Sequence, residues 1–403
     1  MRQIIYAWNY REWGGAQIYF MSLMKEAKKS YAVTALIPAD SEPKILQYLK
    51  SLEIPVEFLP PGLSLKKQNG LHGKLANRLA IMRSENAMVA NILARPNLAD
   101  TILHIDLGFW QSFLSLVRLS KKTNVFMTVH TGLPLYKGWR ALRWKVKGKL
   151  LSRSLNFHLL ASNQDAKNSL KPYVRSDKFG RIEVTYSGID PDEINNVTEN
   201  IPTKTDIQRK YGLPESIPIL MTVGQFIERK GCWVLLESLK QLKDAGNDFI
   251  FVWLSTTLPD TETLKRIETY SLGDSFRLMD ADEIGQTRTD LLTLESVADL
   301  FVLASLQEGL PIALIEAMAL GLPCIATNVN AMPEAIEDGK TGILVQPNDP
   351  IQLREAIIAL LNDPQQRKIL RADAKKIAFE KFNAKNTAER TLKLYNEVWQ
   401  TRH

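Results

Sequence analysis

Two glutamates eight residues apart, Glu308 and Glu316, are the side chains whose spacing in this sequence most clearly suggests chemistry. A tight loop, 308–311, begins at the first of them, and a strong apolar helical pattern then runs from Ile312 to about Leu320. Gly321 ends the pattern, as is typical at a helix C-terminus. One carboxylate is therefore expected just before a helix and the other about one turn inside it.

The apolar run before this loop, 300–304, is typical of a buried strand, so the helix is expected to begin where a parallel strand ends. Open α/β sheets hold ligands at this edge, and the free N–H groups and dipole of a helix N-terminus suit a phosphate. A carboxylate beside a phosphate would repel it unless the carboxylate faced hydroxyl groups, as on a ribose or a sugar ring. The local chemistry therefore suggests a nucleotide sugar. The alternative is an ordinary strand–loop–helix unit with a solvated Glu316.

The elements that must position these residues alternate between strand and helix, and they do so in two successive halves. The expected strands are 4–7, 31–38, 55–60, 101–105, 124–129, 157–161 and 181–186 in the first half, and 219–223, 249–255, 276–279, 300–304, 324–327 and 342–345 in the second. A polar linker, 191–202, is expected between the halves. This pattern predicts an α/β fold of two doubly wound, Rossmann-like domains that face each other across a cleft.

The composition limits the class of protein. A length of 403 residues with 45% apolar and 24% charged residues is normal for a globular chain of two or three domains. Two cysteines, Cys232 and Cys324, provide neither a disulfide framework nor metal-ligand spacing. No apolar run approaches the ~18 residues of a membrane span, and residues 1–8 are typical of a first strand rather than a signal peptide. We therefore expect a cytoplasmic protein.

Positive charge is concentrated in the first half of the chain. Residues 1–200 contain 28 Lys and Arg against 16 Asp and Glu, whereas residues 201–403 contain 23 against 28. A basic first half implies an anionic partner or surface. The most basic segment, Lys137–Arg153, mixes cations with Trp139 and Trp144. As a helix it would either lie on an anionic membrane surface or be a solvated helix with its Trp residues packed inward. We expect no nucleic-acid partner.

Other motifs carry weaker signals. Asp280-Ala281-Asp282 matches the DxD pattern of metal-dependent sugar transferases, but that pattern has only two fixed residues. The patterns GxGxxG, GxxxxGK[ST] and HExxH are absent, so dinucleotide oxidoreductases, P-loop proteins and zincins lack support. His130 follows a predicted strand at the ligand-binding edge, where it would either face a ligand or be a satisfied structural histidine. We expect neither a metal nor a cofactor.

With these stretches established, the sequence resembles family 4 of the retaining GT-B glycosyltransferases. The most specific similarity runs from Glu308 to Glu316 and on through 317–323, which resemble the family's Glu-x7-Glu motif and its EAMA-x-G-x-P continuation. Further family-like positions are Val223-Gly224, Lys230-Gly231, Pro333-Glu334, Thr341-Gly342 and Leu394-Tyr395. The resemblance covers essentially the whole second half. It is weaker in the first half, where Gly14-Gly15-Ala16 resembles a glycine loop that faces the donor phosphates.

The resemblance implies a role for each matched residue. Glu316 would bind the ribose diol, and Glu308 with the backbone of 309–312 would hold sugar hydroxyls and phosphates. Lys230 would neutralise the leaving diphosphate, and His130 would lie beside the transferred sugar. The implied catalytic residues are therefore His130, Lys230 and Glu308. The implied donor-binding set is Gly15, Gly224, Gln225, Arg229, Lys230, Met279, Glu308, Gly309, Leu310, Pro311, Ile312 and Glu316.

A turn at 187–190 and the linker after it separate two predicted domains, 1–190 and 191–380. The resemblance implies that the first is the acceptor-side domain, that the second binds the nucleotide sugar, and that a terminal helix, 381–403, crosses back onto the first. The sequence departs from the family at Gln225, where an arginine is usual, and Arg229 is the nearby candidate to replace that charge.

Two further departures affect the walls of the implied donor pocket. The stretch 255–259 stands in place of a glycine-rich turn, and 330–332 replaces the glycines that usually precede Pro-Glu. The family's usual sugar preference is therefore not assumed for this chain.

Together these features predict a metal-independent, retaining glycosyltransferase of the hexosyltransferase type. It would move a sugar from a nucleotide-diphosphate sugar to a glycan or lipid-linked glycan, in cell-envelope or exopolysaccharide synthesis. It would work in the cytoplasm, with a peripheral position on the inner face of the membrane. The alternatives are a catalytically inactive GT-B protein that binds a nucleotide sugar, suggested by Gln225, and a nucleotide-sugar epimerase.

Overall fold

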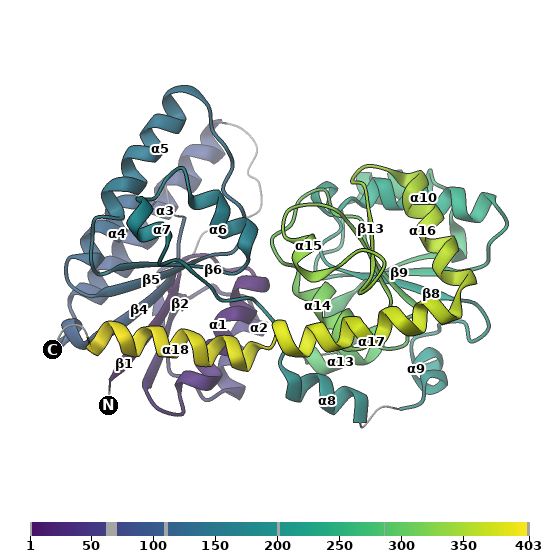
Figure 1. The fold of residues 1–403 in the computed structure, drawn as a ribbon, viewed down its shortest axis with the longest axis horizontal. Helices are drawn as coiled ribbons and strands as arrows, with labels where there is room; N and C mark the ends of the chain where they lie inside the picture. The colour runs from purple at the N-terminus through teal and green to yellow at the C-terminus, as the bar shows by residue number, and fades with distance from the viewer. Residues whose placement is uncertain (1, 62–70, 109–111, 200–201, 286, 401–403) are drawn as a thin grey trace. The chain divides into compact units, whose positions relative to one another are not determined.

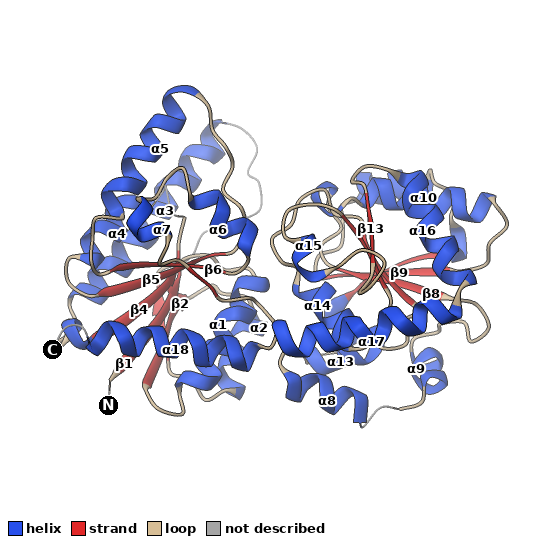
Figure 2. Ribbon diagram, in the orientation of Figure 1, coloured by secondary structure: helices blue, strands red, loops and turns tan. Residues whose placement is uncertain are grey.

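The computed structural model describes residues 2–61, 71–108, 112–199, 202–285 and 287–400. They form two compact units (Figures 1 and 2). The first runs from the N-terminal strand to Ser187 and includes the chain from Ala384 onward, and the second is Gly188–Asn383. Each unit is a parallel sheet with helices packed on it, so the predicted α/β class with two Rossmann-like domains is confirmed.

The first unit is built on a seven-stranded parallel sheet in the order β3-β2-β1-β4-β5-β6-β7. Its strands are β1 (Gln3–Trp8), β2 (Ala32–Pro38), β3 (Val56–Leu59), β4 (Thr101–Asp106), β5 (Asn124–Val129), β6 (Phe157–Ala161) and β7 (Glu183–Val184). In this order the chain adds strands on one side of β1 and then, from β4 onward, on the other. The carboxyl ends of β1 and β4 therefore form a topological switch point, where open α/β sheets bind ligands.

Alternating side chains of β1 explain the layers on the two faces of this sheet, because successive residues of a strand point to opposite faces. Ile5 and Ala7 join one buried core, whereas Ile4, Tyr6 and Trp8 join the other. The first core packs against α3 (Leu71–Leu93), α4 (Phe113–Ser120), α5 (Gly138–Leu151), α6 (Gln164–Leu170) and α7 (Ser176–Phe179). The second packs against α1 (Gly15–Ala27), α2 (Pro43–Ser51) and α18 (Ala384–Gln400). A short 3-10 helix, η1 (Leu98–Asp100), precedes β4.

The last helix, α18, is tied to the first unit by polar contacts as well as by its apolar face. The hydroxyl of Tyr395 contacts Nδ1 of the buried His104, whose Nε2 lies 2.8 Å from the Thr128 hydroxyl. The Thr387 hydroxyl donates to the carbonyl of Tyr186 at 2.8 Å. Since buried polar atoms are costly when unpaired, these bonds fix α18 in one position on the sheet.

The second unit repeats the arrangement with a six-stranded parallel sheet in the order β10-β9-β8-β11-β12-β13. The strands are β8 (Ile219–Val223), β9 (Ile250–Ser255), β10 (Phe276–Asp280), β11 (Leu300–Leu303), β12 (Cys324–Thr327) and β13 (Ile343–Val345). The helices are α8 (Pro191–Glu199), α9 (Lys204–Lys210), η2 (Glu228–Lys230), α10 (Cys232–Asp244), α11 (Thr261–Glu268), η3 (Gly273–Ser275), α12 (Ala281–Ile284), α13 (Arg288–Glu295), α14 (Ile312–Ala319), α15 (Met332–Ala335), α16 (Pro350–Asn362) and α17 (Pro364–Lys381). Here the switch point lies between β8 and β11.

The prediction of a polar linker at 191–202 is wrong for most of its length, because Pro191–Glu199 forms α8. Proline is favoured in the first turn of a helix, and the Asp190 carboxylate accepts a bond from the backbone N–H of Asp192 at 3.0 Å. Ile194 and Val197, three residues apart, are buried. A spacing of three residues is typical of the buried face of a helix, but the other residues of this segment are mostly polar and favoured the linker interpretation. None of the described helices is long and apolar enough to cross a membrane.

Candidate functional site

The loops that follow β8 and β11 meet at the switch point of the second unit and bring two of the predicted site residues together. Lys230, on η2 after β8, places its Nζ 2.6 Å from Oε1 of Glu308, which follows β11. Only 13% of the lysine side chain and 7% of the glutamate side chain are exposed. A charge-assisted pair at this edge is therefore partly withdrawn from water, which strengthens its electrostatic effect on any ligand.

Two glycines make room for the backbone and for the lysine at this site. Gly231 has φ of +69°, and a Cβ atom there would lie 1.8 Å from the carbonyl oxygen of Ala304, at the end of β11. Gly224 has φ of +146°, and a Cβ there would lie 3.5 Å from Nζ of Lys230. Both positions need glycine for its conformation, and Gly231 also needs it for space. Gly231, directly after Lys230 in the sequence, therefore allows the lysine to lie close to the loop that follows β11.

The Glu308 carboxylate is held from several sides. The Ser305 hydroxyl donates to Oε1 at 2.9 Å, and Nη1 of Arg229 lies 3.4 Å from Oε2. The backbone N–H of Glu308 donates to Oδ1 of Asn330 at 3.2 Å. Asn330 has φ of +46°, so it adopts the left-handed conformation that asparagine tolerates better than most residues. Asn330, where the family usually has glycine, therefore keeps the left-handed turn and also accepts a hydrogen bond from the loop that carries Glu308.

The helix that begins next to Glu308 presents backbone donors to the same region. Helix α14 starts at Ile312, and Pro311 at its N-cap position gives no side-chain cap to the first turn. The first N–H groups of a helix lack partners within the helix and carry the positive end of its dipole. Gly309 is half-buried, and Leu310, Pro311 and Ile312 are buried. This arrangement suits a phosphate oxygen next to the Lys230–Glu308 pair.

Glu316 lies one turn into α14 and is buried, with a partner that the sequence did not indicate. Nη2 of Arg288, at the start of α13, pairs with Oε1 of Glu316, while Nε of Arg288 lies 3.2 Å from Oε2 of Glu193 on α8. Burial raises the pKa of Glu316 and the Arg288 charge lowers it. The pKa of the neighbouring Glu295 lies well above its ordinary value because that carboxyl is buried and close to Glu316. Arg288 thus supplies the positive charge that compensates a cluster of carboxyl groups.

The remaining predicted residues of the second unit are less constrained. Gln225, which follows Gly224, is exposed. Met279 is half-buried on β10, the edge strand, and pairs in register with Leu254 of β9. Arg229 is exposed but donates from Nη1 to the carbonyl of Gln307 at 3.0 Å, so it reaches the loop that carries Glu308.

In the first unit, His130 follows β5 and Gly15 begins α1, both at the carboxyl edge of the sheet. The His130 ring lies edge-on to Tyr19, with centroids 5.1 Å apart. Its buried Nε2 has no hydrogen-bond partner among the described residues. Burial lowers the pKa of His130, against the opposing effect of Asp106, so the imidazole is neutral near pH 7. A neutral ring with an unpaired nitrogen can form a hydrogen bond with a ligand hydroxyl.

The Asp280-Ala281-Asp282 motif has a structural explanation. Asp280 caps α12, with Oδ1 accepting from the backbone N–H of Asp282 at 2.9 Å, and no group of three potential metal-ligand residues occurs in the described part of the chain.

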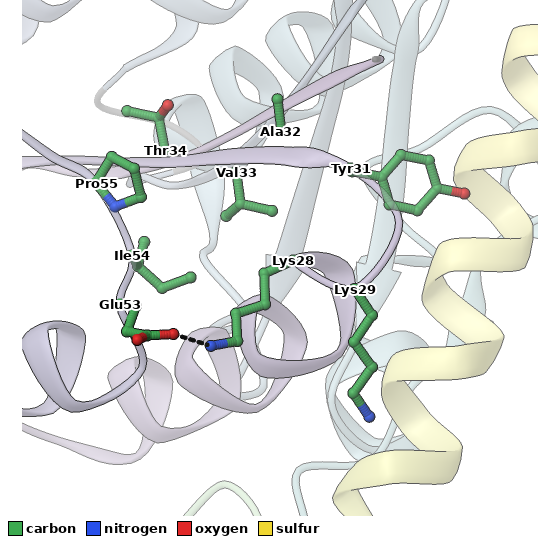
Figure 3. Close-up of a pocket in the computed structure, with 9 residues that line it drawn as sticks. All are labelled: Lys28, Lys29, Tyr31, Ala32, Val33, Thr34, Glu53, Ile54 and Pro55. Carbon is green, nitrogen blue, oxygen red and sulfur yellow. Dashed lines mark hydrogen bonds and ion pairs between the residues drawn. The ribbon is translucent and has the colours of Figure 1, made fainter.

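A pocket of about 520 Å³ lies beside the Lys28–Glu53 ion pair, and Figure 3 shows the residues that line it. It is lined by the start of β2, whereas the candidate site lies at carboxyl ends of strands. We therefore assign no role to this pocket.

Comparison with known proteins finds a family match within the second unit. Residues 203–377 match the family described as glycosyl transferases group 1. Alpha-D-kanosaminyltransferase of Streptomyces kanamyceticus is 27% identical over 197 residues, which cover 48% of this chain and 49% of that protein. D-inositol 3-phosphate glycosyltransferase of Corynebacterium urealyticum is 26% identical over 246 residues, covering 60% and 57%. The chain thus spans about half the length of the curated relatives it matches.

Solved structures match over nearly the whole chain. A glycosyltransferase from Rickettsia africae has a TM-score of 0.75 at 18% identity and covers 98% of both chains. Anabaena HepE in complex with UDP-glucose has a TM-score of 0.75 at 16% identity, covering 98% of this chain and 100% of that one. WaaG, a glycosyltransferase involved in lipopolysaccharide biosynthesis, has a TM-score of 0.69 at 16% identity, covering 96% and 98%. At such identities the similarity concerns the fold, and the predicted GT-B fold is confirmed.

Proposed function

We propose that the protein is a glycosyltransferase that uses a nucleotide-diphosphate sugar, because residues 203–377 match the glycosyl transferases group 1 family and the chain has a two-domain GT-B fold. The main support is that Lys230, Glu308 and the N-terminus of α14 lie together at the switch point between β8 and β11. A lysine, a helix dipole and a fixed carboxylate can hold a diphosphate and a polyhydroxylated group side by side. A plain strand–loop–helix unit would not need the tight approach at Gly231.

In the proposed complex the diphosphate lies between Lys230 and the first N–H groups of α14, and Glu308 accepts bonds from sugar hydroxyls. Glu316 binds the ribose diol, with its carboxylate oriented by Arg288. A nucleotide-sugar donor is supported by the fold similarity to HepE, a protein solved with UDP-glucose. His130, with its neutral imidazole, is proposed to lie beside the transferred sugar.

We propose that the reaction is metal-independent and retains the anomeric configuration. Lys230, Arg229 and the helix N-terminus would stabilise the charge that develops on the departing diphosphate. The acceptor hydroxyl would attack the anomeric carbon from the leaving-group side, and its proton would pass to the departing phosphate oxygen. No enzyme nucleophile takes part in this path, so Glu308 serves as a ligand of the sugar and as a partner of Lys230.

The proposed acceptor is a glycan or a lipid-linked glycan, and the proposed process is cell-envelope or exopolysaccharide synthesis. The basic first half of the chain supports an anionic acceptor or surface, and WaaG, which shares the fold, is involved in lipopolysaccharide biosynthesis. We propose a cytoplasmic location, which two free, buried cysteines support because thiols persist in reducing compartments.

Calorimetric titration with UDP, GDP and ADP and their sugar conjugates, in EDTA, tests the donor site. We expect selective binding to one base in the wild type, and affinity reduced about tenfold or more in Glu316→Gln, equivalent to a loss of ~1.4 kcal/mol. Glu262→Gln, an exposed change on α11, is the matched control and should bind like the wild type. Equal nucleotide affinity in all three proteins would refute the proposal that Glu316 binds the ribose diol.

Product analysis then separates the reaction classes. A transferase releases the nucleotide diphosphate only when an acceptor is added, an epimerase converts the nucleotide sugar without one, and a binding protein does neither. Tight binding without turnover across a panel of glycan and glycolipid acceptors would favour the inactive alternative suggested by Gln225.

A further inference from the structure

Helix α5 of the first unit exposes a row of large apolar side chains that do not belong to the buried core of the unit. Four of them follow a helical spacing and remain open to solvent: Trp139 (77% exposed), Leu142 (51%), Val146 (49%) and Leu150 (46%). Isolated exposed apolar residues are common on protein surfaces, but a continuous row on one helix marks an interaction site. In Figure 1, α5 lies at the upper end of this unit.

The geometry of the helix separates this row from the face that packs on the sheet. At 3.6 residues per turn, the four side chains fall within about 80° of the helix circumference. Gly148 and Leu151, which are buried, lie on the opposite side, and Trp144 packs against the core of the unit. The inward packing considered for both Trp residues therefore holds for Trp144 and not for Trp139.

Cations border the apolar row on both sides. Arg143 lies next to one margin and Lys149 next to the other, with Lys145 beyond it, and all three are exposed. The sequence contains no Asp or Glu between Asp106 and Asp165, so no acidic residue of this stretch is available to neutralise them. An apolar stripe flanked by Lys and Arg, with Trp at one end, is the pattern of helices that lie in the plane of a membrane surface.

We propose that the exposed face of α5 is a membrane-docking surface that lies flat on a bilayer containing anionic phospholipids. The apolar row would enter the boundary between headgroups and acyl chains, and Arg143, Lys145 and Lys149 would contact lipid phosphates. A second copy of this chain is a poorer occupant, because a symmetric contact would set the same cations against one another. The inference stands apart from the proposed glycosyl transfer, since binding to vesicles needs neither donor nor acceptor.

Vesicle flotation of the full-length protein tests the surface. The vesicles contain phosphatidylcholine alone or phosphatidylcholine mixed with phosphatidylglycerol, each at low and at high salt. We expect binding to the mixed vesicles, much weaker binding to pure phosphatidylcholine, and a decrease as salt screens the charges. Equal binding to both vesicle types, or none to either, would overturn the proposal.

Matched variants then test whether α5 is responsible. The triple change Arg143→Gln, Lys145→Gln, Lys149→Gln should lower the partition coefficient about tenfold or more. The control Lys368→Gln, Arg371→Gln, Lys376→Gln removes the same number of charges from exposed positions of α17 in the second unit and should bind like the wild type. If the two triples bind alike, general positive charge rather than this helix attracts the protein, and the proposal fails.

The apolar row needs its own test. Trp139→Ser with Val146→Ser should weaken binding to mixed vesicles even at low salt, whereas Leu264→Ser with Ile369→Ser, at comparably exposed positions of the second unit, should not. All four changes are at exposed sites, and circular dichroism verifies that each variant is folded. Unchanged vesicle binding by the Trp139 and Val146 variant would refute insertion. Light scattering that revealed a dimer lost in this variant would instead assign the row to self-association.

Discussion

Replacing Arg288 by methionine should destabilise the second unit and weaken donor binding together. The Arg288 side chain is 13% exposed and pairs with Glu316, and its Nε lies 3.2 Å from Oε2 of Glu193. Removing one partner of a buried pair leaves an uncompensated buried charge, at a cost of about 3–5 kcal/mol. Methionine has a similar volume, so loss of packing contributes little to this effect. The affinity for the nucleotide should fall because Glu316 loses the group that orients it.

The effect should depend on pH in a defined direction. Burial raises the pKa of Glu316, and Arg288 opposes that rise. In the variant the pKa of Glu316 therefore lies higher still above its unfolded value. Such a carboxyl contributes stability below its unfolded pKa, and the contribution is lost as pH rises through the folded pKa. The variant should therefore be less impaired at about pH 5, where protonation neutralises the carboxyl, than at about pH 8.

Urea denaturation of both proteins at the two pH values, with nucleotide calorimetry alongside, measures these effects. Arg209→Met serves as the control because it breaks a pair with Glu215 in which both side chains are largely exposed, and exposed pairs contribute at most about 1 kcal/mol. The reasoning is refuted if Arg288→Met matches Arg209→Met, or if its loss of stability is the same at both pH values.

Three further predictions concern two residues of the loop after β8 and the independence of the reaction from metal. Lys230→Ala should lower turnover about a hundredfold, because it removes a donor from the proposed leaving-group site, while urea denaturation shows a much smaller effect. Gly231→Ala should destabilise the chain by more than the ~1–2 kcal/mol of a left-handed residue, because the new Cβ would also meet the Ala304 carbonyl; denaturation again measures this. Transfer activity should persist in EDTA, measured as nucleotide diphosphate released with acceptor.

The two substitutions have controls within the chain. Lys240→Ala removes a lysine whose side chain is 42% exposed and pairs with Asp244, and turnover should not change. Gly246 has φ of +80°, and a Cβ atom there would have no neighbour within 4 Å, so Gly246→Ala isolates the conformational cost from the steric one. Equal losses for the two glycine variants would show that the close approach at Gly231 is unimportant. Activity abolished by EDTA would return attention to Asp280 and Asp282.

The strands and the donor loop were accessible from sequence because their signals are local. Strands of a parallel sheet are buried on both faces and form short apolar runs, which the expected strands reflect. Arg288 was not accessible, because it contacts Glu316 from a separate helix and its side chain has no local apolar or capping pattern that points to that contact. Helix α8, which brings Glu193 to the same arginine, was concealed by its polar composition.

Helix α5 illustrates a different limit. This segment was considered as a helix from its sequence, and its composition left two interpretations for the tryptophans. Trp139 and Trp144 are five residues apart and so point in different directions from the axis. Only the packing of α5 on the sheet, through Gly148 and Leu151, determines which of them is buried. Sequence periodicity gives the angle between two side chains and cannot say which of the two faces the core.

The charge balance at the switch point bears on whether this chain is active. Gln225 lacks the charge of the arginine usual at its position, and it is exposed. Arg229 nevertheless lies 3.4 Å from Oε2 of Glu308, and Lys230 lies 2.6 Å from Oε1, so two cations face one carboxylate. The positive end of the α14 dipole lies in the same region. Arg229 is therefore our candidate to supply the charge that Gln225 lacks at the proposed diphosphate position, as an active enzyme would require.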